Sequence, residues 1–223
     1  MTQERLNKQI IITTILLIVV ISIFELTNID MIFQSYLYDP SNNSWLIDEK
    51  YAPLYILFYS GFKTIFIVFS ILIILITLFL KKNVLVKTYK NGLVILSLSL
   101  IFVPSLALLK NITNMPCPFN VIEFGGKYPE IKLFESYPEE LTPQSTLKCY
   151  PAGHATMGFS LMALYFLFKT PRNKNIALTF GIIIGILTGG YKILIGDHFL
   201  SHTLITMILA WLTILIISKL TKN

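Results

Sequence analysis

Charged residues are scarce in this chain of 223 residues: they make up 13% of the sequence, whereas 54% of the residues are hydrophobic. Soluble globular domains carry about 25% charged residues, so this chain could not cover a water-facing surface. The hydrophobic content also excludes a disordered chain. The net charge of +6 does not indicate nucleic acid as a partner, because the basic residues are spread over several loops. The composition therefore predicts a small integral membrane protein.

Six stretches with no or few charged residues predict transmembrane helices. A hydrocarbon core of roughly 30 Å needs about 20 apolar residues, and each stretch reaches this length when its uncharged flanks take part. Their Leu, Ile, Phe and Gly content, without alternating polar residues, favours helices over barrel strands. We therefore expect an all-α fold, with residues 1–223 forming one transmembrane domain, a six-helix bundle. The predicted spans are residues 9–24, 64–80, 91–109, 153–168, 175–191 and 199–218.

The distribution of charge predicts the orientation of these spans. Lysine and arginine are concentrated in the short segments 81–90 and 169–174, whereas most acidic residues lie in the long segments 26–53 and 110–151. By the positive-inside rule, both chain termini are expected in the cytoplasm and the two long segments on the outer face. We expect segment 110–151, which is rich in Pro and Gly, to form a loop cap over a site at that face.

The chain has three histidines, and all of them fall at the outer ends of the predicted fourth and sixth spans. One histidine at such a position could be an ordinary interfacial residue. Three of them, close in the predicted topology to two lysines and an aspartate, favour a functional site. The residues concerned are His154, His198, His202, Lys110, Lys192 and Asp197.

Phosphoryl transfer is the chemistry that suits this group of residues. Imidazole serves as nucleophile or as acid near neutral pH, and lysines can hold the phosphate oxygens. Two histidines on different helix ends can approach one phosphorus atom from opposite sides. The sequence from Pro151 to His154 adds a turn followed by a helix start, whose backbone N–H groups favour an anion. This mechanism requires neither a metal nor a cofactor.

Three motifs resemble the signatures of the type-2 phosphatidic acid phosphatase (PAP2) superfamily. Pro151-Ala152-Gly153-His154 resembles the second signature, Pro-Ser-Gly-His. The pattern Lys192-x5-His198-x3-His202 is similar to the third, Arg-x5-His-x3-Asp, and Lys110-x6-Cys117-Pro118 is similar to the first, Lys-x6-Arg-Pro. The motifs occur in the family's order and at outer helix ends, so the resemblance covers both the catalytic frame and the topology.

The resemblance implies a role for each matching residue. His198 would be the nucleophile that forms a phosphohistidine, and His154 would protonate the departing oxygen and later activate water. Lys110 and Lys192 would hold phosphate oxygens, together with the backbone N–H of Gly153. The implied enzyme is a phosphoric monoester hydrolase whose partners are a lipid substrate and the bilayer.

The chain departs from the family signatures at three positions. Cys117 stands in place of an arginine, and Lys192 replaces another arginine without its two-pronged contact. Lys148 either restores the missing charge or is an exposed loop lysine. His202 stands in place of the aspartate that orients the nucleophile. It would reach His198 at i+4 on a helix, and Asp197 is the second candidate for that role.

Cys117 and Cys149 are the two cysteines of the chain, and both lie in segment 110–151. In an oxidising compartment they can form a disulfide, whereas the alternative is two free thiols. A bridge here would stabilise the loop by roughly 3–4 kcal/mol in the chain-entropy treatment. It would also tie the first signature segment to the second.

Within the superfamily, the Cys-for-Arg and His-for-Asp pattern and the long loop from Gly125-Gly126 to Pro143 are most similar to the bacterial lipid A 4′-phosphatase branch. This resemblance implies hydrolysis of a phosphate monoester of lipid A, a lipopolysaccharide modification, on the periplasmic face of the inner membrane. Undecaprenyl pyrophosphate, phosphatidylglycerol phosphate and the 1-phosphate of lipid A are alternative substrates.

Two readings of another kind stay open, as does the oligomeric state. His198 and His202 are spaced i, i+4 and could bind a metal with His154, but a zinc-protease motif needs Glu where Phe199 stands. A non-catalytic lipid transporter or channel would place polar residues along the helices through the membrane. Here the ionisable residues lie at the helix ends, which favours an interfacial enzyme without a metal.

Overall fold

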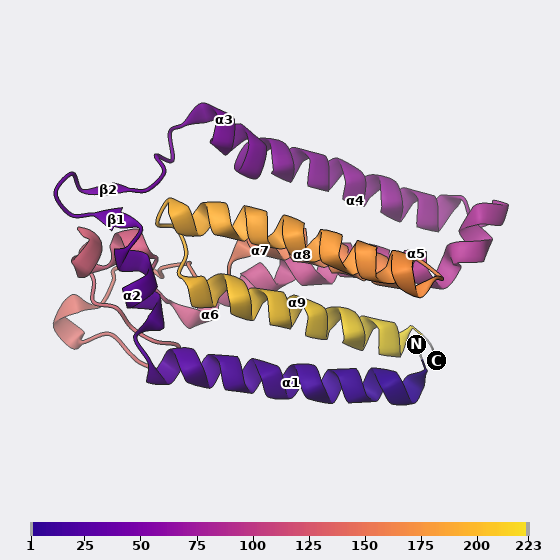
Figure 1. Cartoon of the computed structure of the whole chain (residues 1–223), viewed down its shortest axis with the longest axis horizontal. Coiled ribbons are helices and arrows are strands. Elements are labelled where there is room, and N and C mark those ends of the chain that lie inside the picture. The colour runs from indigo at the N-terminus through magenta and orange to yellow at the C-terminus, as the bar shows by residue number, and fades with distance from the viewer. Residues whose placement is uncertain (1, 222–223) are drawn as a thin grey trace.

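The computed structural model describes residues 2–221, and its regular structure is almost entirely helical (Figure 1). One small antiparallel pair joins β1 (Tyr38–Asp39) to β2 (Ser44–Trp45). This architecture confirms the predicted all-α class. The long helices are α1 (Gln3–Leu26), α4 (Gly61–Phe79), α5 (Val84–Ser105), α8 (Pro171–Leu194) and α9 (Leu200–Leu220). The short helices are α2 (Ile29–Ser35), α3 (Ala52–Tyr55), α6 (Lys110–Thr113) and α7 (Gly153–Ser160).

Five helical stretches within residues 2–221 are long and apolar enough to cross a membrane. The chain is therefore a multi-pass membrane protein, and these stretches correspond to five of the six predicted spans. The second begins well before residue 64, because α3, a π-helix over Ile56–Ser60 and α4 follow one another without a break. The exposed Lys63 marks the start of the charge-free run, but the helix continues through it towards the N-terminus. The stretches are Gln3–Leu26, Ala52–Phe79, Val84–Asn120, Pro171–Leu194 and Leu200–Leu220.

The fourth predicted span is shorter than expected. It consists of α7 followed by a 3₁₀-helix over Leu161–Phe166, and the irregular turn after Phe166 leads into α8. At 1.5 Å per α-helical and 2.0 Å per 3₁₀ residue, the two pieces together reach about 24 Å. That is less than the roughly 30 Å of a hydrocarbon core. This segment is instead an internal helix that packs against α5, α8 and α9.

Small residues allow α7 to approach its neighbours closely. A Cβ atom built on Gly158 would lie 2.6 Å from the Cα atom of Gly185 on α8, so the two backbones are in contact at this crossing. Close helix contacts through small residues are typical of membrane bundles. Around the crossing, the core includes Ala155, Phe159 and Leu96, all fully buried.

The two ends of the bundle differ in composition (Figure 1). Helix α1 begins and α9 ends at one end, where α4 also turns into α5. Segments 27–51 and 114–152 lie at the opposite end, over the turn between α8 and α9. At that end Tyr38, Trp45 and Phe124 form an aromatic cluster with ring centroids 4.8–5.5 Å apart. The two segments are therefore packed together and onto the helix ends.

Candidate active site

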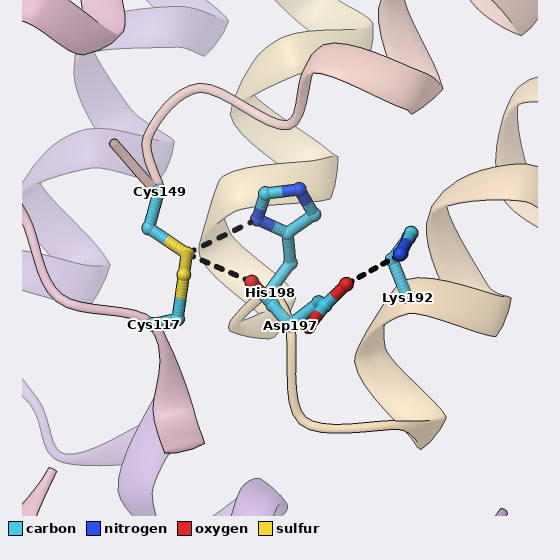
Figure 2. Close-up of polar contacts among 5 residues, drawn as sticks. All are labelled: Cys117, Cys149, Lys192, Asp197 and His198. Atoms are coloured by element: carbon cyan, nitrogen blue, oxygen red, sulfur yellow. Dashed lines mark hydrogen bonds and ion pairs between the residues drawn. A yellow bond between two sulfur atoms is a disulfide. The ribbon is translucent and has the colours of Figure 1, made fainter. Parts of the chain in front are cut away.

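The turn between α8 and α9 brings three polar side chains together. Gly196 has a φ of +80°, which a glycine adopts without strain. The amides of Asp197 and His198 both donate hydrogen bonds to the carbonyl oxygen of Lys192, at 2.8 and 3.2 Å. These bonds close the end of α8, so that Lys192, Asp197 and His198 lie side by side (Figure 2). The ring of Trp45 lies against Gly196, where a Cβ atom would not fit.

Lys192 is a buried cation with two partners. It is 4% exposed, forms an ion pair with Asp197, and holds its Nζ atom 4.3 Å from the centre of the Tyr59 ring. A buried ammonium group is costly unless it is paired. The carboxylate and the aromatic face together supply that pairing. An anionic group placed here would meet a cation whose neighbours are already in position.

His198 lies directly after this ion pair and is 5% exposed. Burial lowers the pKa of His198 well below its ordinary value, and the nearby charge of Lys110 lowers it further. Lys192, His154 and His202 also lie close enough to act on it electrostatically. The imidazole is therefore neutral near pH 7, which is the form that can act as a nucleophile.

His154 reaches the same end of the bundle from a different helix. It is the second residue of α7, and its ring stacks on Tyr59 with the centroids 4.3 Å apart. Its Nε2 atom is buried and has no hydrogen-bond partner among residues 2–221. Tyr59 therefore contacts both His154 and Lys192.

Lys110 lies against the N-terminus of α7. A Cβ atom on Gly153 would be 3.4 Å from the Lys110 Nζ atom, so the ammonium group borders the first residue of α7. The amide of Ala152 donates to Thr206 on α9 at 3.0 Å, which holds this turn in place. The N-terminal amides of a helix lack intrahelical acceptors. Together with Lys110 they form a site suited to an anion.

His202 makes no hydrogen bond to His198 in this structure. It is fully buried, and in the described part of the chain neither of its ring nitrogens has a hydrogen-bond partner. Its ring centroid is 5.7 Å from that of His198, and the edges of Tyr150 and Phe199 enclose it. The expected i, i+4 hydrogen bond is absent because α9 begins at Leu200. His198 therefore lies before the helix, and its ring meets the His202 ring in an edge contact without a hydrogen bond.

The two cysteines are joined by a disulfide, with their Cα atoms 5.2 Å apart. The bridge connects the segment before the 3₁₀-helix Pro118–Asn120 to the loop that precedes α7. The Cys149 Sγ atom lies 3.5 Å from Nδ1 of His198 and 2.8 Å from the carbonyl oxygen of Asp197 (Figure 2). Lys148, beside Cys149, is exposed.

The ligand atoms of Cys149, His198 and His202 all lie within 4.8 Å of one another. This set differs from the three histidines that the sequence suggested as metal ligands. A thiolate is the form of cysteine that binds metals. The Cys149 sulfur is bonded to Cys117, so this trio offers no thiolate.

Two contacts in the site were not predicted. Tyr59 belongs to none of the three motifs, and nothing in the sequence around it singled it out. The sulfur of Cys149 was expected to link loops rather than to contact a histidine. A π-helix, which often marks a functional position, carries Tyr59. Its presence could not be inferred from the apolar sequence around it.

The fold and the site together define a multi-pass membrane protein with histidines and lysines gathered at one end of its helices. Residues 92–223 match the PAP2 superfamily, so the chain belongs to this superfamily. It is a PAP2-type phosphatase, a phosphoric monoester hydrolase, and lipid phosphates are typical substrates of the class. No curated protein and no solved structure matches the chain.

Proposed function

We propose that this protein hydrolyses a phosphate monoester of lipid A, at the 4′-position, through a phosphohistidine on His198. The observation that carries the proposal is that His198, His154, Lys110 and Lys192 meet at one end of the bundle, from three separate parts of the chain. A neutral imidazole, a second imidazole and two ammonium groups are what phosphoryl transfer without a metal requires.

In the first step, Nε2 of His198 attacks the phosphorus atom while the bond to the ester oxygen breaks. His154 gives its proton to that oxygen, which leaves as an alcohol. Lys110, Lys192 and the amide of Gly153 hold the other phosphate oxygens. In the second step, His154 takes a proton from water, the water oxygen attacks phosphorus, and the N–P bond breaks. His198 returns to its free form and inorganic phosphate is released.

The Lys192–Asp197 ion pair has a consequence for substrate binding. A bound phosphate would share the ammonium group with Asp197, so the carboxylate would compete with the substrate for it. The same carboxylate holds the ammonium group in place before substrate arrives. We assign Asp197 this role rather than that of orienting the nucleophile. Lys148, which is exposed beside Cys149, is proposed to meet the outer part of the headgroup.

Two features of the surface support a large lipid headgroup. A hollow of about 600 Å³ borders Asp197, lined by segment 43–50 together with Phe119 and Ile195. This leaves room beside the phosphate site for sugar rings. Ile56 and Leu57, on the same π-helix as Tyr59, are exposed. Their apolar side chains suit the acyl chains of a lipid in the adjoining bilayer.

The proposal includes a topology. The site end carries the acidic segments and the opposite end carries the lysines of segment 81–90, which supports an external site and cytoplasmic termini. We place the site at the periplasmic face of a bacterial inner membrane, under a cap formed by segments 26–53 and 110–151. The internal helix 153–166 completes a six-helix bundle without crossing the full hydrocarbon core.

The direct test is phosphate release by the purified protein in the presence of EDTA. His198→Ala should reduce kcat by about 10³-fold or more, because the nucleophile is lost. His154→Ala should reduce it by about 10²–10⁴-fold. The wild type should yield an acid-labile phosphohistidine that His198→Ala does not form. Lys127→Ala, an exposed lysine of the cap, is the control for Lys110→Ala.

A panel of substrates tests the position of the phosphate. We expect release from lipid A carrying only the 4′-phosphate, and much less from its 1-phosphate isomer, undecaprenyl pyrophosphate or phosphatidylglycerol phosphate. Preference for one of the other lipids would replace the lipid A assignment without affecting His198. Full activity in His198→Ala would instead refute the proposed nucleophile, and dependence on added zinc would support a metal mechanism.

A further inference from the structure

A disulfide sulfur lies beside the His198 ring. The Cys149 Sγ atom lies 3.5 Å from Nδ1 of His198, and both residues are buried. Figure 2 shows the sulfur facing Nδ1, with the other ring nitrogen directed away from the bridge. This contact is part of the site, yet none of the three signature motifs includes Cys149.

The chemistry of the bridge limits what this contact can be. A disulfide sulfur carries no hydrogen, so it can only accept. The contact is favourable when Nδ1 carries the proton and points it at the sulfur. In that tautomer the lone pair lies on Nε2, the nitrogen directed away from the bridge. The sulfur therefore selects the tautomer that an attack through Nε2 requires.

Two other candidate partners, Asp197 and His202, do not hydrogen-bond to Nδ1. The carboxylate of Asp197 is paired with Lys192. Neither ring nitrogen of His202 has a hydrogen-bond partner within residues 2–221, so His202 does not hold the His198 ring. The sulfur is thus the polar atom found at Nδ1.

The surrounding contacts hold the sulfur in position. Cys149 is fully buried, and its Sγ atom also contacts the carbonyl oxygen of Asp197 at 2.8 Å. On the other side of the bridge, the amide of Phe119, two residues after Cys117, donates to the carbonyl oxygen of Gly196 at 3.1 Å. The Cys117 side of the disulfide is therefore hydrogen-bonded to the turn that carries His198, and Cys149 is packed against the same turn.

We infer that Cys149 is a positioning residue for His198: its sulfur accepts a hydrogen bond from Nδ1–H in place of a carboxylate. This inference rests on the proposed role of His198 as nucleophile. A neutral sulfur stabilises a developing positive charge on the ring less than a carboxylate would. The sulfur contributes by fixing the orientation and the tautomer of the His198 ring, and these affect kcat rather than substrate binding.

Two single variants separate the sulfur from the bridge. Cys149→Ala and Cys117→Ala both remove the disulfide, but Cys117→Ala leaves a thiol sulfur beside His198. With EDTA present, we expect kcat to fall about tenfold in Cys149→Ala, with KM within about twofold, the size of one lost hydrogen bond. Cys117→Ala should lose about threefold or less, and apparent melting temperatures of the two variants should agree.

Equal losses of kcat in the two variants would overturn the inference, since the bridge alone would then matter. A change confined to KM would overturn it as well. Treatment of the wild type with a dithiol transfers two electrons to the bridge and yields two thiols. The kcat of the treated protein should equal that of Cys117→Ala. A kcat equal to that of Cys149→Ala would contradict the inference.

A spectroscopic measurement covers the case in which either variant fails to fold. In ¹⁵N-histidine-labelled wild type, the His198 signal should show a protonated Nδ1 and a bare Nε2. A bare Nδ1 would refute the inference. The proposed function has its own test: full activity of the His198→Ala variant would refute it. An inactive His198→Ala with equal Cys117→Ala and Cys149→Ala variants rejects only the positioning role.

Discussion

The outer and inner helices of this protein bury very different shares of their residues. In the most apolar stretch of α1, 6% of the residues are buried, and in the stretch that contains α4 the share is 11%. The corresponding shares are 44% for α8 and 56% for α9. All four helices are apolar, so hydrophobicity alone does not separate them. The outer helices keep their apolar side chains for lipid, whereas the inner ones pack against protein.

The region matched to the PAP2 superfamily, residues 92–223, contains the inner helices. There, close packing fixes the positions of His154, Lys192 and His198. From the preceding part of the chain, Tyr59 contacts both Lys192 and His154. The comparison indicates that the buried half holds the histidines and lysines of the candidate site, and that Tyr59 from the lipid-facing half packs against two of them.

The largest expected effect comes from the crossing of α7 and α8. Gly158→Val places two methyl groups where the backbone of Gly185 lies, and should destabilise the fold by about 3 kcal/mol. Ile15→Val on α1 is the matched change on the outer surface, where Ile15 is 56% exposed. It should alter stability by less than about 0.5 kcal/mol. Unfolding in detergent measures the free-energy change in both variants. Losses of similar size would contradict the division into inner and outer helices.

A smaller effect is expected at the point where the outer half meets the site. Tyr59→Leu removes the aromatic face from Lys192 and His154, and should lower kcat/KM by about tenfold. Tyr59→Phe keeps the face and should stay within about twofold of the wild type. Phosphate release measures these values. Equal losses in both variants would assign the effect to the hydroxyl group instead of the ring.

The smallest expected effect is a dependence of cap stability on pH. Burial raises the pKa of Asp30 from 3.8 to about 6 and that of Glu130 from 4.5 to about 7. The folded protein therefore binds more protons than the unfolded chain between about pH 4 and 7, and stability should fall as the pH rises through this range. Thermal unfolding at pH 5 and pH 8 would measure the change.

The double variant Asp30→Asn/Glu130→Gln should flatten this pH dependence. Asp39→Asn is the control, because hydrogen bonds from Ser41 lower the pKa of Asp39, so this group loses its contribution only at lower pH. A steeper dependence in the double variant would mean that other groups govern the stability of the cap.

Much of the fold could be predicted from the chain as written. The charge-free runs located five helices that can cross a membrane, and the patterning predicted an all-α protein. The start of the second helix was missed because an exposed Lys63 interrupts the run without interrupting the helix. The fourth was predicted too long, since burial among other helices, rather than length, explains the apolar character of 153–166.

The residues of the site could be identified in part. The spacing of the three motifs pointed to His154, His198, Lys110 and Lys192. The partner of His198 could not be found in this way, because i, i+4 spacing places two side chains together only when both lie on one helix. His198 precedes the first residue of α9. Tyr59 was missed because aromatic residues are common near membrane surfaces, so its presence there does not indicate a site.

The amino-acid order by itself determined that the chain is helical, that it belongs in a bilayer and that its imidazoles share one end with Lys110 and Lys192. These properties follow from local hydropathy and from the placement of charge, which need no knowledge of neighbours. Only the tertiary structure decided which atom faces Nδ1 of His198, which carboxylate pairs with Lys192 and which ring supports His154. Such contacts join segments far apart in the chain, and close packing over distances of a few ångströms settles them.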